Sequence, residues 1–274
     1  MEVYKISILS FFISMILSII GIPFLLNMLK DNNCLCINYK NEEIPSSMGL
    51  LFIIVQTITL SLMNLFIAED LRHYVLIYLV AFILVGLVGL LDDLVGDKNV
   101  KGFKGHIKSL LKGKLTTGGL KASVGFLVAL IISLYISNSI IETIINTLLI
   151  SLFTNLINLF DLRPGRASKV FILVSIILLI TSWYDDLSIL LFSFFGILFR
   201  YLPIDLKANA MMGDVGSNSL GITLGAYCAI THDLKIKIIY LVVLIAVQML
   251  SEFVSFSKII EKNKFLRYID NLGR

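Results

Sequence analysis

Charged residues are scarce in this sequence: Asp, Glu, Lys and Arg make up 15% of the 274 residues, whereas 57% are hydrophobic. A soluble domain of this size cannot bury so large an apolar fraction. Nearly uncharged runs of about 15 to 25 residues recur along the chain, and the short alternating segments of a transmembrane β-barrel are missing. The composition therefore predicts a helical membrane protein that crosses the bilayer several times.

Other absences exclude further classes of protein. Cys34 and Cys36 have no second cysteine pair with which to form a zinc site, and Cys228 lies in an apolar run where it serves packing. No internal repeat is visible, which argues against the inverted-repeat transporters. No linker or soluble segment interrupts residues 1–274, so we expect a single membrane domain. The first apolar run lacks a cleavage site and is expected to be a span, not a signal peptide.

The apolar runs predict an all-α, polytopic transmembrane bundle of about nine spans. The basic residues fix its orientation, with the N-terminus outside and the C-terminus in the cytoplasm: of 23 Lys and Arg, only Lys5, Arg72, Lys235 and Lys237 then lie outside. The sixth and seventh spans are short, and a re-entrant hairpin is the alternative for that pair. The predicted spans are residues 4–29, 48–67, 74–91, 120–137, 141–160, 169–183, 188–200, 216–231 and 236–257.

Four acids stand where predicted spans meet the cytoplasm. Asp92 and Asp93 end the third span, Asp161 ends the fifth and Asp214 precedes the eighth. A carboxylate at a membrane edge is costly, and the helix macrodipole disfavours negative charge at a helix C-terminus. A divalent cation would offset both penalties, and Mg²⁺ prefers oxygen ligands. The pattern favours a cation site on the cytoplasmic face.

Two asparagines precede one of these acids at a spacing of three. Asn155, Asn158 and Asp161 would lie near one face of a helix. Asparagines inside an apolar helix are costly unless they are paired, which favours a functional role. Helix capping by asparagine next to a loop acid is the alternative.

A glycine-rich stretch surrounds Asp214. Gly213 and Gly216 would let the backbone approach a ligand closely, and free N–H groups at a helix start attract phosphate. Simple N-capping by Asp214 or Ser217 is the alternative interpretation.

A basic stripe is predicted between the third and fourth spans. Lys101, Lys104, Lys108 and Lys112 recur at helical spacing with His106 among them. Attraction to anionic lipid explains most of these lysines, and phosphate binding beside the acids is the functional reading for one or two of them. A second acidic pair, Asp185–Asp186, falls in an outside turn and is expected to be solvated. The Asp-Asp dipeptide is therefore not informative by itself, and Asp92–Asp93 is informative because of where it lies.

Taken together, these motifs resemble those of the polyprenyl-phosphate N-acetylhexosamine-1-phosphate transferases. That superfamily includes the phospho-N-acetylmuramoyl-pentapeptide transferases of peptidoglycan synthesis. The resemblance covers the chain from about residue 38 onward. It rests on Ile44-Pro45-Ser-Ser-Met-Gly49, Gly-Leu-Leu-Asp92-Asp93-Leu, Lys101-Gly-Phe-Lys-Gly-His-Ile-Lys108, Asn155-Leu-Ile-Asn158-Leu-Phe-Asp161 and Met-Gly213-Asp214-Val-Gly216-Ser217, in this order.

The resemblance implies transfer of a sugar-1-phosphate from a UDP-sugar to a membrane polyprenyl phosphate, with release of UMP. It implies Mg²⁺, with Mn²⁺ as an alternative, at a cytoplasmic-face site in a bacterial-type cytoplasmic membrane. The expected partners are these two substrates and membrane lipids, with a homodimer as an option and no nucleic acid. The implied metal ligands are Asp214 and Asp93; the catalytic residues are Asp92, Asp93, Asp161 and Lys108; the substrate-binding residues are Asn155, Asn158, Lys101, Lys104, His106, Arg163, Arg166, Gly213, Gly216 and Ser217.

Two departures from the family pattern leave the donor sugar open. Pro164 stands where the family has a second acid, and the C-terminal segment, an expected amphipathic interfacial helix, has no histidine where many members carry a His-rich motif. Arg163 and Arg166 are candidate replacements that grip phosphate. A catalytically silent relative that binds polyprenyl phosphate or a partner is one alternative, and an unrelated transporter is another. Direct attack by the acceptor phosphate is favoured over a covalent aspartyl intermediate.

Overall fold

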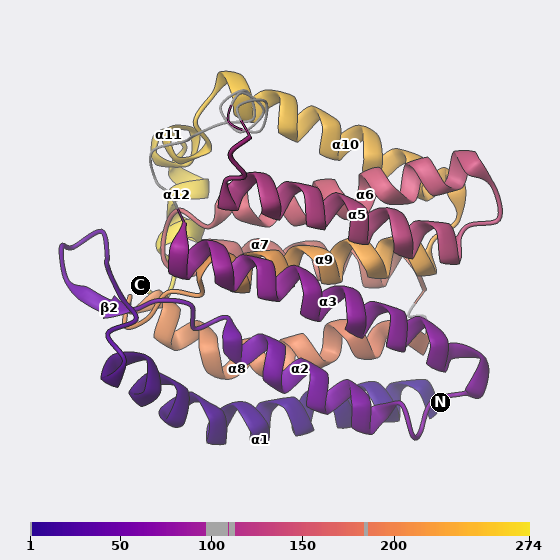
Figure 1. The fold of residues 1–274 in the computed structure, drawn as a ribbon, viewed down its shortest axis with the longest axis horizontal. Coiled ribbons are helices and arrows are strands. Elements are labelled where there is room, and N and C mark those ends of the chain that lie inside the picture. The colour runs from indigo at the N-terminus through magenta and orange to yellow at the C-terminus, as the bar shows by residue number, and fades with distance from the viewer. Residues whose placement is uncertain (1, 97–108, 110–112, 184–185) are drawn as a thin grey trace.

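A computed structural model describes residues 2–96, 109, 113–183 and 186–274 of the chain, and helices dominate it (Figure 1). Each of the nine predicted spans overlaps one long helix, although the ninth, 236–257, extends beyond the end of its helix at Phe253. Two short helices follow at the C-terminus. The long helices are α1 (Glu2–Asp31), α2 (Leu50–Met63), α3 (Glu69–Val95), α5 (Thr117–Ile136), α6 (Ile140–Phe160), α7 (Arg166–Thr181), α8 (Ile189–Leu206), α9 (Gly213–Thr231) and α10 (Leu234–Phe253); the short ones are α11 (Phe256–Lys262) and α12 (Lys264–Asn271).

Within the described part of the chain, six helices are long and apolar enough to cross a membrane: α1, α3, α5, α6, α8 and α10. Helix α2 is apolar but shorter. Helix α9 is the most enclosed, because every residue from 215 to 229 is buried. The all-α membrane fold is confirmed, whereas the count of nine spans and the outside N-terminus stay predictions.

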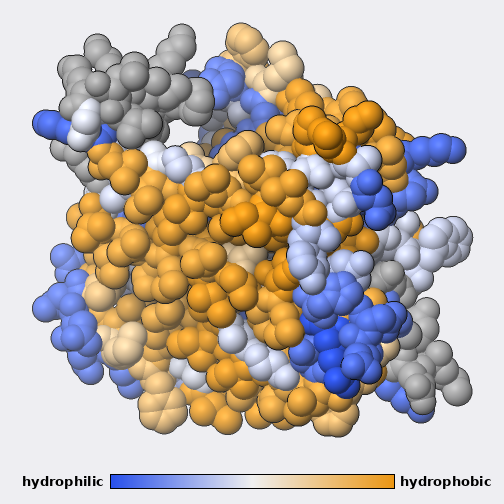
Figure 2. All heavy atoms as spheres, turned by 45° about the vertical axis from the view of Figure 1, so that its right-hand side comes forward, coloured by the Kyte–Doolittle hydropathy of each residue, from blue (hydrophilic) through white to orange (hydrophobic). Residues whose placement is uncertain are grey.

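The outward faces of the bundle are apolar, as a bilayer requires. Large side chains such as Phe24 on α1, Ile131 on α5 and Val242 on α10 are exposed. Figure 2 shows one such face, on which apolar residues form a broad continuous area and hydrophilic ones gather toward its edges. Apolar side chains exposed on the outside of a membrane bundle face lipid.

A β-hairpin, which the sequence analysis did not anticipate, occupies the loop between α1 and α2. Its strands β1 (Leu35–Ile37) and β2 (Glu43–Pro45) pair antiparallel. The hairpin, α11 and α12 lie at one end of the bundle, opposite the N-terminus (Figure 1). This end also holds the C-terminus of α3 and the N-terminus of α9, where the sequence placed its acids.

The segment after the hairpin pairs with the segment before α9. Met48 donates its backbone N–H to the Met211 carbonyl at 2.9 Å, and Gly49 donates to Met212 at 2.9 Å. A Cβ on Gly49 would overlap backbone atoms of Gly216. Glycine at both positions therefore lets the starts of α2 and α9 meet backbone to backbone.

Candidate active site

Asp93 on α3 caps the start of α9. Its carboxylate accepts the backbone N–H of Asp214 at 2.7 Å and that of Val215 at 3.2 Å. The first N–H groups of a helix have no partner within the helix, so an acid here satisfies two of them and complements the macrodipole. Gly213 takes a left-handed backbone with φ of 69° directly before the capped turn, where a Cβ would strike the Asp93 carboxylate.

Three helices bring charged side chains together beside this cap. Lys121 on α5 donates to Asp214 at 2.7 Å and lies 3.4 Å from an Asp92 oxygen. The Asp92 and Asp214 carboxyl groups are within hydrogen-bonding distance of each other, with the Thr117 hydroxyl beside Asp92. All three charged side chains keep some solvent exposure, between 17% and 33%, so a ligand can reach them.

Asp161 follows the end of α6 and faces the same acids. Burial raises the pKa of its carboxyl group well above the ordinary value, and the negative charges of Asp205, Asp214 and Asp93 raise it further. Asp161 and Asp205 line a cavity of about 280 Å³ that also borders Arg163. The four acids expected from the sequence thus gather at one end of the bundle.

The two asparagines of α6 face different neighbours. Asn158 donates to the Asn218 side-chain oxygen at 2.7 Å and accepts a short hydrogen bond from the Ser217 hydroxyl. Asn155 donates to Gln248 on α10 at 2.7 Å. Asn158 and Ser217 therefore tie α6 to the capped turn of α9, whereas Asn155 ties α6 to α10.

The two arginines after α6 also differ. The Arg163 guanidinium lies 5.7 Å from the ring centre of Tyr39 in the hairpin and 3.7 Å from Glu261 of α11. Both members of this ion pair are exposed to solvent, so a ligand can reach the guanidinium. Arg166 is 4% exposed, and its guanidinium is taken by Asp270 and Ser257 of the C-terminal segment. Gly216 is buried against Gly49, which gives it a packing role.

The predicted basic stripe cannot be placed in this arrangement, because Lys101, Lys104, His106 and Lys108 lie outside the described residues. The sequence analysis missed Lys121, which resembled any other cytoplasmic lysine. It also missed Asp205, an acid in the last turn of α8, the seventh long helix, where its position at the end of an apolar helix was a usable signal. Nothing in the sequence reveals that Lys121 would lie between two aspartates of other helices.

Among the described residues, no group of three or more His, Cys, Asp or Glu side chains is arranged to hold a metal ion. The donor set near Lys121 consists of the two carboxylates of Asp92 and Asp214. Mg²⁺ commonly uses one or two carboxylates, with waters and substrate phosphates as its other ligands. This pair fits such a cation, which substrate phosphates would help to hold.

The sequence profile of glycosyl transferase family 4 matches residues 75–232, which include all four acids and both asparagines. The chain belongs to glycosyl transferase family 4. The family match supports the superfamily that the motifs resemble and identifies an integral membrane glycosyl-phosphate transferase. No curated protein matches the sequence.

Proposed function

We propose that this family 4 transferase moves a sugar-1-phosphate, from the resemblance an N-acetylhexosamine-1-phosphate, from a UDP-sugar to polyprenyl phosphate. The observation that carries the proposal is the meeting of Asp92, Lys121 and Asp214 from three helices at one end of the bundle. Both substrates bring phosphate groups to that end, and one of them is anchored in the membrane. Acids, an ammonium group and a membrane-edge position together suit this pair of reactants.

In the reaction, an oxygen of the acceptor phosphate attacks the β-phosphorus of the donor. The bond between that phosphorus and the bridging oxygen breaks, and the bridging oxygen leaves with UMP. Asp92, which lies closer to solvent than the capping Asp93, takes the proton if the acceptor phosphate carries one. Lys121 holds a phosphate oxygen and offsets the charge that develops on the leaving group.

A divalent cation, Mg²⁺ or Mn²⁺, would be held by Asp214 and Asp92. When bound, it neutralises charge on the transferring and leaving oxygens. Both carboxylate oxygens of Asp93 accept backbone N–H groups of α9, so we propose that Asp93 shapes the site. Asp92 then takes its place as the second metal ligand. Lys121 also contacts the carboxylates of Asp92 and Asp214. The cation and the lysine would therefore both interact with these two acids.

The acceptor chain needs an apolar channel at the membrane edge. A groove of about 630 Å³ runs between α6, α7, α10 and the two C-terminal helices, with Leu173, Val243 and Ile259 among its apolar walls. Its charged end holds Arg166, Lys169 and Asp270. We propose that the polyprenyl chain lies in this groove, with its phosphate directed toward Asp161.

The donor would enter through the cavity beside Arg163. This cavity joins Asp161 to the exposed Tyr39, so a nucleotide could lie across it with its diphosphate near the acids. Arg163 lies at the rim of this cavity and is accessible. A guanidinium can donate two parallel hydrogen bonds to one phosphate group.

The test is release of UMP by purified protein in the presence of undecaprenyl phosphate, Mg²⁺ and a panel of UDP-N-acetylhexosamines and other UDP-sugars. We expect turnover with at least one donor, abolished by EDTA and by Asp214→Asn. Asp186→Asn, an exposed carboxylate at the other end of the bundle, should keep full turnover. Lack of turnover with every donor, together with saturable binding of polyprenyl phosphate, would instead identify a silent lipid-binding relative.

A further inference from the structure

The C-terminal segment is fastened to the turn that carries Asp161 and Arg163. Asp270 in α12 forms a two-pronged ion pair with Arg166, with both bonds at 2.8 Å. Arg166 begins α7, directly after this turn of residues 161–165. A two-pronged guanidinium–carboxylate pair fixes direction as well as distance, so it locates α12 against the start of α7.

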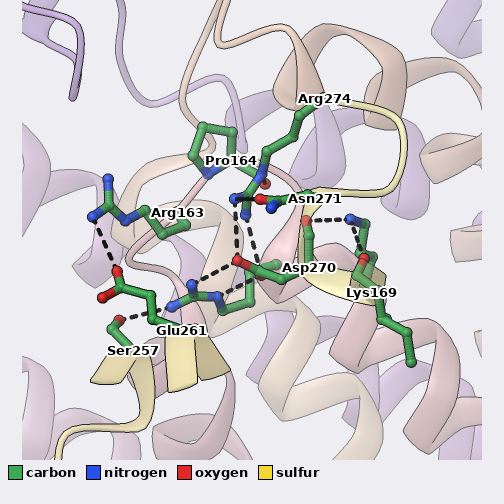
Figure 3. Close-up of polar contacts among 10 residues, drawn as sticks. Arg163, Pro164, Lys169, Ser257, Glu261, Asp270, Asn271 and Arg274 are labelled. Carbon is green, nitrogen blue, oxygen red and sulfur yellow. Dashed lines mark hydrogen bonds and ion pairs between the residues drawn. The ribbon is translucent and has the colours of Figure 1, made fainter. Parts of the chain in front are cut away.

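Further contacts tie the same two segments together (Figure 3). Arg274 donates to the backbone carbonyl of Pro164 at 2.9 Å and to Asp270 at 3.1 Å. Lys169 donates to the carbonyls of Ile269 and Asp270 in the last turn of α12, at 2.9 and 2.7 Å. We call these contacts of Asp270, Arg274 and Lys169 the C-terminal clamp.

Packing from α11 and α8 adds to the clamp on the two sides of the turn. On the α6 side, the ring of Phe256 stacks on Phe160 with centroids 5.2 Å apart, immediately before Asp161. On the α7 side, Gly165 takes a left-handed backbone with φ of 74° and packs against Leu206. A turn held at both flanks and at a carbonyl between them has little freedom to shift the side chains that it carries.

We propose that Asp270 is a positioning residue for the transferase site. Through Arg166 and Arg274 it fixes the 161–165 turn, and the turn fixes Asp161 and Arg163 at the edge of the cavity. The turn contains Pro164 and no second acid, and its Arg163 pairs with Glu261 of α11 at 3.7 Å. In this chain the C-terminal segment supplies that support from outside the turn.

The inference rests on the proposed function only where activity is the readout. Hydrogen exchange tests it independently, because amides of a loosened turn exchange faster. In the Asp270→Asn variant in lipid nanodiscs, we expect peptides covering residues 161–166 to exchange at least about tenfold faster. Peptides from α9 should exchange as in the wild type. An unchanged turn in Asp270→Asn would overturn the proposal.

Kinetics then separates positioning from a general loss of stability. Asp270→Asn should lower kcat/KM about tenfold, mainly by raising KM for the nucleotide-sugar, since Arg163 and the cavity rim shift. Asp270→Glu should restore more than half of the loss, and Glu252→Gln, an exposed acid near the same segment, should match the wild type. An equal fall in kcat with every donor and no change in KM would overturn the positioning role. If the wild type itself transfers nothing, the proposed function fails, and the exchange result alone decides this inference.

Discussion

Asp93 holds the first turn of α9 in place by accepting the backbone N–H of Asp214 at 2.7 Å. The neighbouring Asp92 faces Lys121, whose ammonium nitrogen lies 3.4 Å from its carboxylate. Two adjacent carboxylates of the same helix therefore have different tasks. Asp93 caps the start of α9, and Asp92 lies beside Lys121 and Asp214, where a substrate or a cation would meet it.

This division predicts different phenotypes for the two acids. Asp93→Ala should lose turnover and also lower the free energy of unfolding by about 0.5–2 kcal/mol, the usual cost of a lost helix cap. For a chain of this size that corresponds to a fall of about 1–8 °C in the melting temperature. Asp92→Asn should lose turnover and stay within about 0.5 kcal/mol of the wild type. Equal melting temperatures for Asp93→Ala and the wild type would contradict the capping role.

Much of this arrangement could be predicted from the sequence. The helices follow from long apolar runs, and the gathering of Asp92, Asp161 and Asp214 follows from topology, because alternate span ends share one side of the membrane. Partners distant in sequence could not be predicted. The ion pairs of Lys121 with Asp214 and of Asp270 with Arg166 are examples. Each joins residues far apart in the sequence, and only the packing of the helices brings them together.

Lys121 offers the next prediction. Replacing it by Met removes the ammonium group that offsets Asp92 and Asp214, so turnover should fall on the order of 10²- to 10³-fold, as when one charge-stabilising donor is lost. The two acids, now without their cation, should bind Mg²⁺ more tightly. We expect a larger rise in melting temperature on adding Mg²⁺ than the wild type shows.

The matched control is Lys207→Met, which removes an exposed lysine that follows α8. It should leave both turnover and the Mg²⁺ response unchanged. Full turnover in Lys121→Met would remove this residue from the site.

A steric prediction comes from the meeting of α2 and α9. Gly49→Ala would drive a methyl group into the backbone of Gly216 and the Met212 carbonyl, none of which can rotate away. Such overpacking costs typically about 1–3 kcal/mol and would shift the start of α9, which carries Asp214. Thermal unfolding and UMP release should therefore decline together.

Gly125→Ala is the contrasting substitution, because nothing lies within 4 Å of the added Cβ. This glycine lies inside α5, so alanine should be neutral or more stable by about 0.5–1 kcal/mol. If both substitutions behave alike, the close approach of Gly49 and Gly216 does not limit stability.

The C-terminal clamp should also respond to acid. Burial alone would raise the pKa of the Asp270 carboxyl, but the hydrogen bonds and charges of Arg166 and Arg274 hold it below the ordinary value. A lowered pKa in the docked state means that the clamp is fully formed above the undocked pKa, about 3.9. Its contribution is lost as the pH falls through the docked pKa, below that value.

Pepsin cleavage within α12 should therefore be slow at about pH 5 and faster toward about pH 2, measured against Asp270→Asn at each pH so that the enzyme's own pH dependence cancels. The ratio of the two rates should approach one in acid, whereas equal cleavage at about pH 5 would show that the ion pair does not hold the segment.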